Sequence, residues 1–173
     1  MIRPSILSTA TWLAAGAMTE TNRPAEWLPV MQVMINRAVT RKKSVYQVLR
    51  EPWQFSAFNA LKSIPMADEA KVLAEVVRHL GHGAEAMIEK ARDTALDMID
   101  RQPDRAVLPL TVTNYWSPRS MVPAGALPRG WNWKILRCFT YPGVPGWRFV
   151  FAETVPSGSP GSGNQAKFEM APA

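Results

Sequence analysis

Residues 12–24 read WLAAGAMTETNRP, and the fold of the N-terminal part of the chain depends on how this stretch is interpreted. It is an apolar run with one carboxylate, Glu20, immediately before a polar turn that ends in Pro24. Such a run can belong to a signal peptide, to a core helix, or to the wall of a site in which Glu20 is the working acid. The flanking residues favour a helix.

The N-terminal residues imitate a secretory signal only in part. Arg3 precedes a partly apolar segment and the small-residue run AAGA (14–17), but a proline and several hydroxyl residues interrupt that segment. We therefore predict a helix with Ser8 or Thr9 as its N-cap. Its inner face consists of small and apolar residues: Trp12, Leu13, Gly16 and Ala17. The small residues would let a neighbouring element approach closely, and Glu20, one turn later, would lie at the edge of an apolar floor.

Four further helical segments are predicted before Pro103. Apolar residues at helical spacing place them from Pro24 to the basic cluster 41–43, over 44–49, over 63–80 and over 84–101. Proline in the first turn and basic residues in the last turn support the first of these segments. Ser44 is the expected cap of the short second segment, and Gly81 is expected to end the third.

The hydrophobic period changes after Pro103. Alternating or β-rich runs predict three strands, within 108–116, 134–141 and 147–153, the last two joined by the hairpin-like PGVPG. A long loop, residues 117–133, separates the first strand from the second, and loops of that length are commonly functional. Residues 156–173 are rich in Gly, Ser and Pro and are expected to form a flexible tail. We therefore expect an α+β fold with one domain over residues 1–155.

The 173-residue chain has the composition of a globular protein, with 47% hydrophobic and 20% charged residues. No apolar run is long enough to span a membrane as a helix. The formal net charge of +6 predicts attraction to polyanions such as nucleic acid, anionic lipid or bacterial cell wall. Lysine and arginine are spread along the chain outside 41–43, and no recognition helix or zinc-finger pattern is present. We therefore expect no specific nucleic-acid partner.

The sequence predicts no metal or other cofactor. His79 and His82 are the only histidines, and two ligands without a third at usable spacing are better explained as solvated helix-end residues. The run GSPGSG does not connect a strand to a helix, as a phosphate-binding loop does. Cys138 is the single cysteine, and its place in a predicted strand indicates a small buried hydrophobic residue.

Four blocks of the sequence carry a family resemblance. They are Glu20 in AMTETNRP, Asn36–Arg37 in MQVMINRA, Gln54–Phe55–Ser56 with Phe58–Asn59 in WQFSAFNA, and Thr113–Asn114–Tyr115 in VTNYWSP, followed by Trp131 or Trp133. In this order and approximate spacing they resemble the cell-wall hydrolase family of the spore-cortex-lytic enzyme SleB. The turn after Glu20 lacks the Gly and the second Glu of the family pattern. Asn114 and Arg148 stand where the family usually has histidine.

The resemblance implies a lysozyme-like or lytic-transglycosylase-like α+β fold, with a helical body, a small antiparallel sheet and a cleft between them that holds Glu20. It implies peptidoglycan as the substrate, cleaved at the β-1,4 bond between N-acetylmuramic acid and N-acetylglucosamine. A short globular chain without a convincing export signal suggests a bacteriophage lysin (an endolysin), released by a holin or carried in a virion. A bacterial enzyme is the alternative source.

The chemistry of Glu20 fits this reaction. Glycosidic cleavage needs an acid that is protonated near neutral pH, and an apolar wall is expected to raise the pKa of Glu20 toward that range. The only carboxylate near it in the sequence is Glu26, which we expect to be exposed at the start of the next helix. Without a second carboxylate, the 6-hydroxyl of muramic acid is the expected nucleophile, as in a lytic transglycosylase.

The expected sugar-binding residues supply amides, hydroxyls and aromatic rings. They are Gln54, Ser56, Asn114, Tyr115, Trp131 and Trp133. Trp27 and Phe55 are expected to be core residues, and a core role stays open for Tyr115 and for one of the two tryptophans. Two other functions also stay open: a hydrolytic muramidase, and a noncatalytic virion protein that retains the hydrolase fold.

Overall fold

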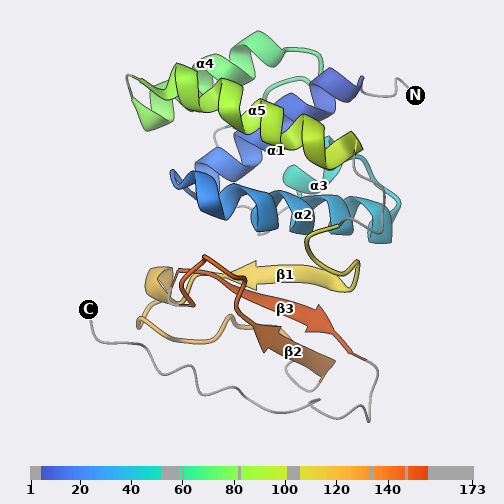
Figure 1. Cartoon of the computed structure of the whole chain (residues 1–173), viewed down its shortest axis with the longest axis vertical. Helices are drawn as coiled ribbons and strands as arrows, with labels where there is room; N and C mark the ends of the chain where they lie inside the picture. The colour runs from blue at the N-terminus through green and yellow to red at the C-terminus, as the bar shows by residue number, and fades with distance from the viewer. Residues whose placement is uncertain are drawn as a thin grey trace. The chain divides into compact units, whose positions relative to one another are not determined.

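The computed structural model describes residues 5–51, 59, 61–81, 83–100, 106–132, 135–146 and 148–155. The chain divides into two compact units between Leu108 and Pro109. The helical unit contains α1 (Ile6–Glu20), α2 (Pro24–Arg41), α3 (Val45–Leu49), α4 (Glu69–Leu80) and α5 (Ala84–Asp100) (Figure 1). The sheet unit contains β1 (Val112–Trp116), a 3-10 turn (Pro118–Ser120), β2 (Leu136–Phe139) and β3 (Val150–Thr154). The expected combination of helices with a small antiparallel sheet is confirmed, whereas the single domain over residues 1–155 stays a prediction.

The N-cap of helix α1 lies three or four residues before the expected one. Ser5 is the N-cap, and its hydroxyl accepts a hydrogen bond from the Ser8 N–H at 3.0 Å. The assignment of Ser8 or Thr9 as N-cap was therefore wrong. Both lie in the first turn, where the Thr9 hydroxyl donates to the Ser5 carbonyl at 3.0 Å. The helix ends as expected at Glu20, because Thr21 is extended and its N–H donates to the Ala17 carbonyl at 3.0 Å.

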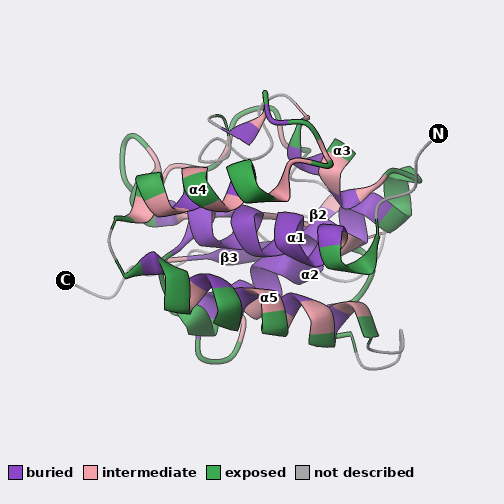
Figure 2. Ribbon diagram, turned by 90° about the horizontal axis from the view of Figure 1, so that it is seen from above, coloured by how far each residue is buried: buried purple, intermediate pink, exposed green. Residues whose placement is uncertain are grey.

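Helix α1 is the central element of the helical unit. It packs against α2, α3, α4 and α5, and Figure 2 shows it as an almost continuously buried ribbon. Every residue from Ala10 to Thr19 is buried. The polar side chains in this stretch are hydrogen-bonded: the Thr11 hydroxyl donates to the Leu7 carbonyl and to Glu69 Oε2, and the Trp12 indole N–H donates to the Met66 carbonyl. A helix covered on all sides needs such bonds, because buried polar groups are costly when left unsatisfied.

Gly16 is a point of close approach between α1 and its neighbours. A Cβ atom built at this position would lie 2.9 Å from Leu49 Cδ2 and 3.1 Å from both Sδ and Cε of Met34. These contacts come from α3 and α2, the next two elements along the chain. The expectation that a small residue here permits close helix packing is confirmed.

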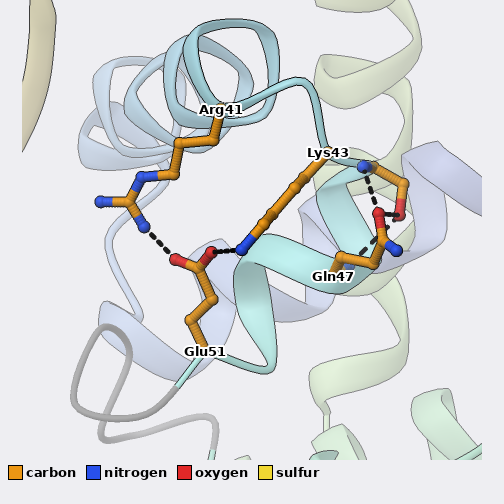
Figure 3. A network of polar contacts seen from close by, with 5 residues as sticks. Arg41, Lys43, Gln47 and Glu51 are labelled. Atoms are coloured by element: carbon orange, nitrogen blue, oxygen red, sulfur yellow. Dashed lines mark hydrogen bonds and ion pairs between the residues drawn. The ribbon is translucent and has the colours of Figure 1, made fainter.

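Helices α2 and α3 follow the sequence pattern closely. Pro24 opens α2, and Lys42 ends it in the left-handed conformation with φ 53°. Ser44 and Gln47 form a reciprocal capping box at the start of α3, as the position of Ser44 predicted. Figure 3 shows that the Glu51 carboxyl, beyond the end of α3, accepts hydrogen bonds from Arg41 and from Lys43, the latter at 2.7 Å. The basic cluster therefore ties the end of α2 to the residue that follows α3.

The remaining two helices differ in how well the sequence placed them. The segment predicted over 63–80 is helical only from Glu69, because Asp68 is its N-cap and accepts from the Lys71 N–H at 3.2 Å. Residues 61–68 form turns instead, with Ile64 donating to Leu61 and Asp68 to Pro65. Helix α5 agrees with its prediction to within one residue.

The three strands form an antiparallel sheet in the order β1-β3-β2. The expected hairpin is confirmed, since β2 pairs directly with β3, and Cys138 lies opposite Ala152. Trp116, Leu136, Val150 and Ala152 form the buried core of the sheet. Burial of Glu153 raises the pKa of its carboxyl, but hydrogen bonds from Arg137 and Thr111 and the charge of Arg137 outweigh it, so the pKa lies below its usual range. The predicted tail over 156–173 lies outside the described residues.

The close approach at Gly16 leads to a stability prediction. Gly16→Val should lower the free energy of unfolding by about 1–3 kcal/mol, because its methyl groups have no space between α1, α2 and α3. Gly16→Ala is the matched control. It meets only the flexible ends of Met34 and Leu49, and alanine favours a helix by about 1 kcal/mol over glycine. Urea denaturation followed by circular dichroism measures both, and equal stability of the two variants would contradict the packing argument.

Candidate functional site

Glu20 is the last residue of α1, and the fold determines its surroundings. The residues of α1 that precede Glu20, from Ala10 to Thr19, are all buried, so Glu20 is the first residue after the buried part of the helix. The side chain itself is partly exposed, while its Oε1 atom is shielded from solvent. The C-terminal end of a helix carries partial negative charge, which disfavours an ionised carboxylate at that end. The Glu20 side chain thus combines partial access to solvent with one oxygen that is shielded from it.

The turn after Glu20 is held by several hydrogen bonds that meet at Thr21. The Thr21 hydroxyl donates to Glu26 Oε2 and accepts from the Arg23 N–H at 3.2 Å. The Thr21 carbonyl accepts from the indole N–H of Trp27 at 3.0 Å. Trp27 is fully buried, which confirms the prediction that it is a core residue.

Glu26 is the residue on which the sequence prediction was wrong. We expected an exposed carboxylate at the start of a helix, but Glu26 is only 2% exposed. Its position in the first turn of α2 suits a carboxylate, because the helix N-terminus carries partial positive charge. The Glu26 carboxyl accepts a hydrogen bond from the Thr21 hydroxyl, five residues earlier in the chain. The helical unit therefore holds two carboxyl groups beside the same turn, one partly exposed and one buried.

Further polar residues are buried along α2. Asn36 and Arg37, which mark one block of the family resemblance, are 2% and 3% exposed. Gln32 donates from Nε2 to Asn36 Oδ1 at 2.9 Å, and its Oε1 accepts from the Val107 N–H at 3.3 Å. Buried amides and a buried guanidinium are uncommon on a core helix, because such groups are usually at the surface. The sequence offered one signal for them, the four-residue spacing of Gln32 and Asn36 on one helix face.

The predicted sugar-binding residues are distributed over both units. Gln54, Ser56 and Trp133, together with the expected core residue Phe55, lie outside the described residues. Asn114 and Tyr115 are adjacent on β1, where both are partly buried. Trp131 packs against the core of the sheet and makes an edge-on contact with Trp116, with ring centroids 5.5 Å apart. The expectation that Gln54, Ser56 and Tyr115 lie around one groove with Glu20 stays a prediction.

Tyr115 belongs to an aromatic group within the sheet unit. Its ring lies 5.4 Å from that of Phe149 and 6.0 Å from that of Phe151. The Arg148 guanidinium lies over the Phe149 ring, 6.0 Å from its centroid. Asn114 precedes Tyr115 on β1, and its Nδ2 donates to the Thr113 hydroxyl at 3.2 Å. Tyr115 therefore has the packing of a core aromatic residue on at least one side.

Neither a metal-binding cluster nor a membrane-spanning helix is found among the described residues. No group of three or more His, Cys, Asp or Glu side chains in that part of the chain could hold a metal ion. His79 lies in the last turn of α4, and His82 lies outside the described residues. None of the described helices has the length and apolar character needed to cross a membrane.

Comparisons with models of protein families, with curated protein sequences and with solved structures give no significant match. The resemblance to the cell-wall hydrolases therefore depends on the four sequence blocks. The helical unit contains the first two blocks, and the described part of the fourth block lies in the sheet unit.

Cys138 gives a prediction about reactivity. It is partly buried rather than buried as expected, and burial raises the pKa of its thiol from 9.0 to about 11. Only the thiolate reacts with disulfide reagents, so at pH 8 the folded protein should react roughly 100-fold more slowly than the unfolded chain. Ellman's reagent, with and without guanidinium chloride, measures this ratio. Equal rates in the two states would show that the thiol is not protected.

Proposed function

We propose that this chain cleaves the glycan strands of peptidoglycan as a lytic transglycosylase, at the β-1,4 bond between N-acetylmuramic acid and N-acetylglucosamine. The observation that carries the proposal is the position of Glu20, a partly exposed carboxyl at the end of a buried helix with one oxygen shielded from solvent. A general acid for glycosidic cleavage needs both substrate access and an environment that favours the protonated form. The lysozyme-like character of the α+β fold is part of the same proposal.

The reaction needs one acid/base group and no added water. Protonated Glu20 donates its proton to the glycosidic oxygen, the bond from that oxygen to C1 of muramic acid breaks, and positive charge develops at C1 and the ring oxygen. The 6-hydroxyl of the same sugar then attacks C1. The Glu20 carboxylate accepts the hydroxyl proton, which restores the acid and leaves a 1,6-anhydro product.

Burial of Glu26 favours this reaction over hydrolysis. An inverting muramidase needs a second carboxylate that holds a water molecule opposite the leaving group, and a retaining enzyme needs one that reaches C1. A side chain that is 2% exposed has almost no surface for either water or sugar. The carboxylate nearest to Glu20 in the sequence is therefore poorly placed for both hydrolytic roles.

The charge of the chain supports a cell-wall substrate. Twenty lysine and arginine residues against 14 aspartate and glutamate residues give a net charge of +6. Peptidoglycan and its attached polymers are anionic, so a cationic protein is concentrated at the wall by long-range attraction. A bacteriophage lysin, released by a holin or carried in a virion, is the proposed biological setting.

The role of Glu20 is tested by Glu20→Gln, which keeps the shape of the side chain but removes its acidic proton. We expect clearing of purified sacculi to fall by a factor of ~10² or more while the circular dichroism spectrum is retained. Glu85→Gln is the matched control, because Glu85 is an exposed glutamate in the first turn of α5. It should clear sacculi at the native rate.

Two results of this assay would contradict the proposal. Native activity in Glu20→Gln would remove Glu20 from the mechanism. No clearing by the native protein, on sacculi of several wall types, would instead favour the noncatalytic virion protein.

The product distinguishes transglycosylation from hydrolysis. We expect digested sacculi to yield muropeptides that end in 1,6-anhydro-N-acetylmuramic acid, because the internal hydroxyl takes the place of water. Mass spectrometry detects these ends, which are one water lighter than the reducing ends released by a muramidase. Reducing-end muramic acid would assign the enzyme to hydrolysis, and free stem peptides would show that the cleaved bond is an amide.

A further inference from the structure

Thr21 is the most firmly held residue of the turn beside Glu20. It is 4% exposed and has an extended backbone, with φ −156° and ψ 140°. Its N–H donates to Ala17 at the end of α1, and its carbonyl accepts from Trp27 on α2. Its hydroxyl donates to Glu26 and accepts from the Arg23 N–H. Both backbone polar groups and the side chain are therefore fixed at once.

We propose that Glu26 is a positioning residue that acts through Thr21 to fix the direction of the Glu20 side chain. This inference rests on the proposed function, because it assigns Glu26 a part in the chemistry of Glu20. Glu26 supplies the side-chain acceptor for the Thr21 hydroxyl. Glu26 belongs to α2, so the bond ties the residue after Glu20 to the first turn of the next helix.

The hydrogen bond between Thr21 and Glu26 is close enough to Glu20 in the chain to affect its position. Thr21 and Glu20 share a peptide bond, so a rotation of Thr21 moves the C-terminal end of α1 and the Cα of Glu20. Misplacement of a catalytic group by about 1 Å can reduce the rate by up to about 10²-fold. The burial of Glu26 agrees with this role, since a positioning group needs no contact with the substrate.

The test compares two variants of Thr21 in the full chain. Thr21→Val removes the hydroxyl with little change in shape, and Thr21→Ser keeps the hydroxyl. We expect Thr21→Val to lower kcat for the release of soluble muropeptides from sacculi by roughly tenfold, with the apparent KM within about twofold of native. Thr21→Ser should retain at least half of the native kcat. Rates are expressed per folded protein, with the folded fraction taken from near-ultraviolet circular dichroism.

Thr11→Val is the control for a purely structural effect. Thr11 is a buried threonine within α1 and lies more than two helical turns from Glu20. Like Thr21, it donates its hydroxyl to a glutamate, in this case Glu69 Oε2 at 2.9 Å. Thr11→Val should lower the Tm but leave kcat per folded protein unchanged. An equal loss of kcat in Thr11→Val and Thr21→Val would overturn the positioning role, because it would show that any weakening of α1 has this effect.

Glu26→Gln separates positioning from direct catalysis and stands in if Thr21→Val does not fold. The glutamine carbonyl can still accept from Thr21, so we expect a loss of no more than about tenfold and unchanged 1,6-anhydro products. A loss as large as that of Glu20→Gln would overturn the proposal and make Glu26 a second catalytic carboxylate. Native kcat in both Thr21→Val and Glu26→Gln would also overturn it. Failure of the proposed function itself is recognised separately, by an active Glu20→Gln or an inactive native protein.

Discussion

The helical unit depends on the burial of α1 by four other helices. A helix surrounded in this way must present small side chains where neighbours come close, and Gly16 meets this need against Met34 and Leu49. It must also satisfy its own polar groups, which the Thr19 hydroxyl does by donating to the Gly16 carbonyl at 2.9 Å. Packed interiors resist small displacements, so the core fixes the path of α1 as far as its last buried residue, Thr19.

The elements that the sequence predicted well are those whose signals are local. The start of α2 at Pro24 and the capping box at Ser44 depend on neighbouring residues only, and both were predicted. The N-cap of α1 was missed because three hydroxyl residues within five positions could each serve. The choice of Ser5 over Ser8 involves a contact far along the chain, in which the Ser8 hydroxyl donates to the Met66 carbonyl at 3.5 Å. Competition of this kind cannot be resolved by propensity.

The sequence predicted one of the two carboxyl groups of the candidate site, Glu20, and not the burial of the other, Glu26. The place of Glu20 at the end of an apolar helix follows from the spacing of small residues and the polar turn after it. The burial of Glu26 does not, because a carboxylate in the first turn of a helix is ordinarily solvated and favourable at the surface. The exposed fraction of a side chain depends on how the elements pack together, which the local pattern does not record. The sheet residues Asn114 and Tyr115 were placed on a strand correctly, whereas their relation to Glu20 stays a prediction.

The turn between α1 and α2 joins the stability of the helical unit to its proposed chemistry. The bonds at Thr21 end one helix and stabilise the start of the next, so selection for a stable core would also preserve the geometry of Glu20. Two carboxyl groups six positions apart thereby acquire opposite environments. One lies at the negative end of a helix and is partly exposed, and the other lies at the positive end of a helix and is buried. The two proposed roles, general acid for Glu20 and positioning residue for Glu26, depend on this difference in exposure.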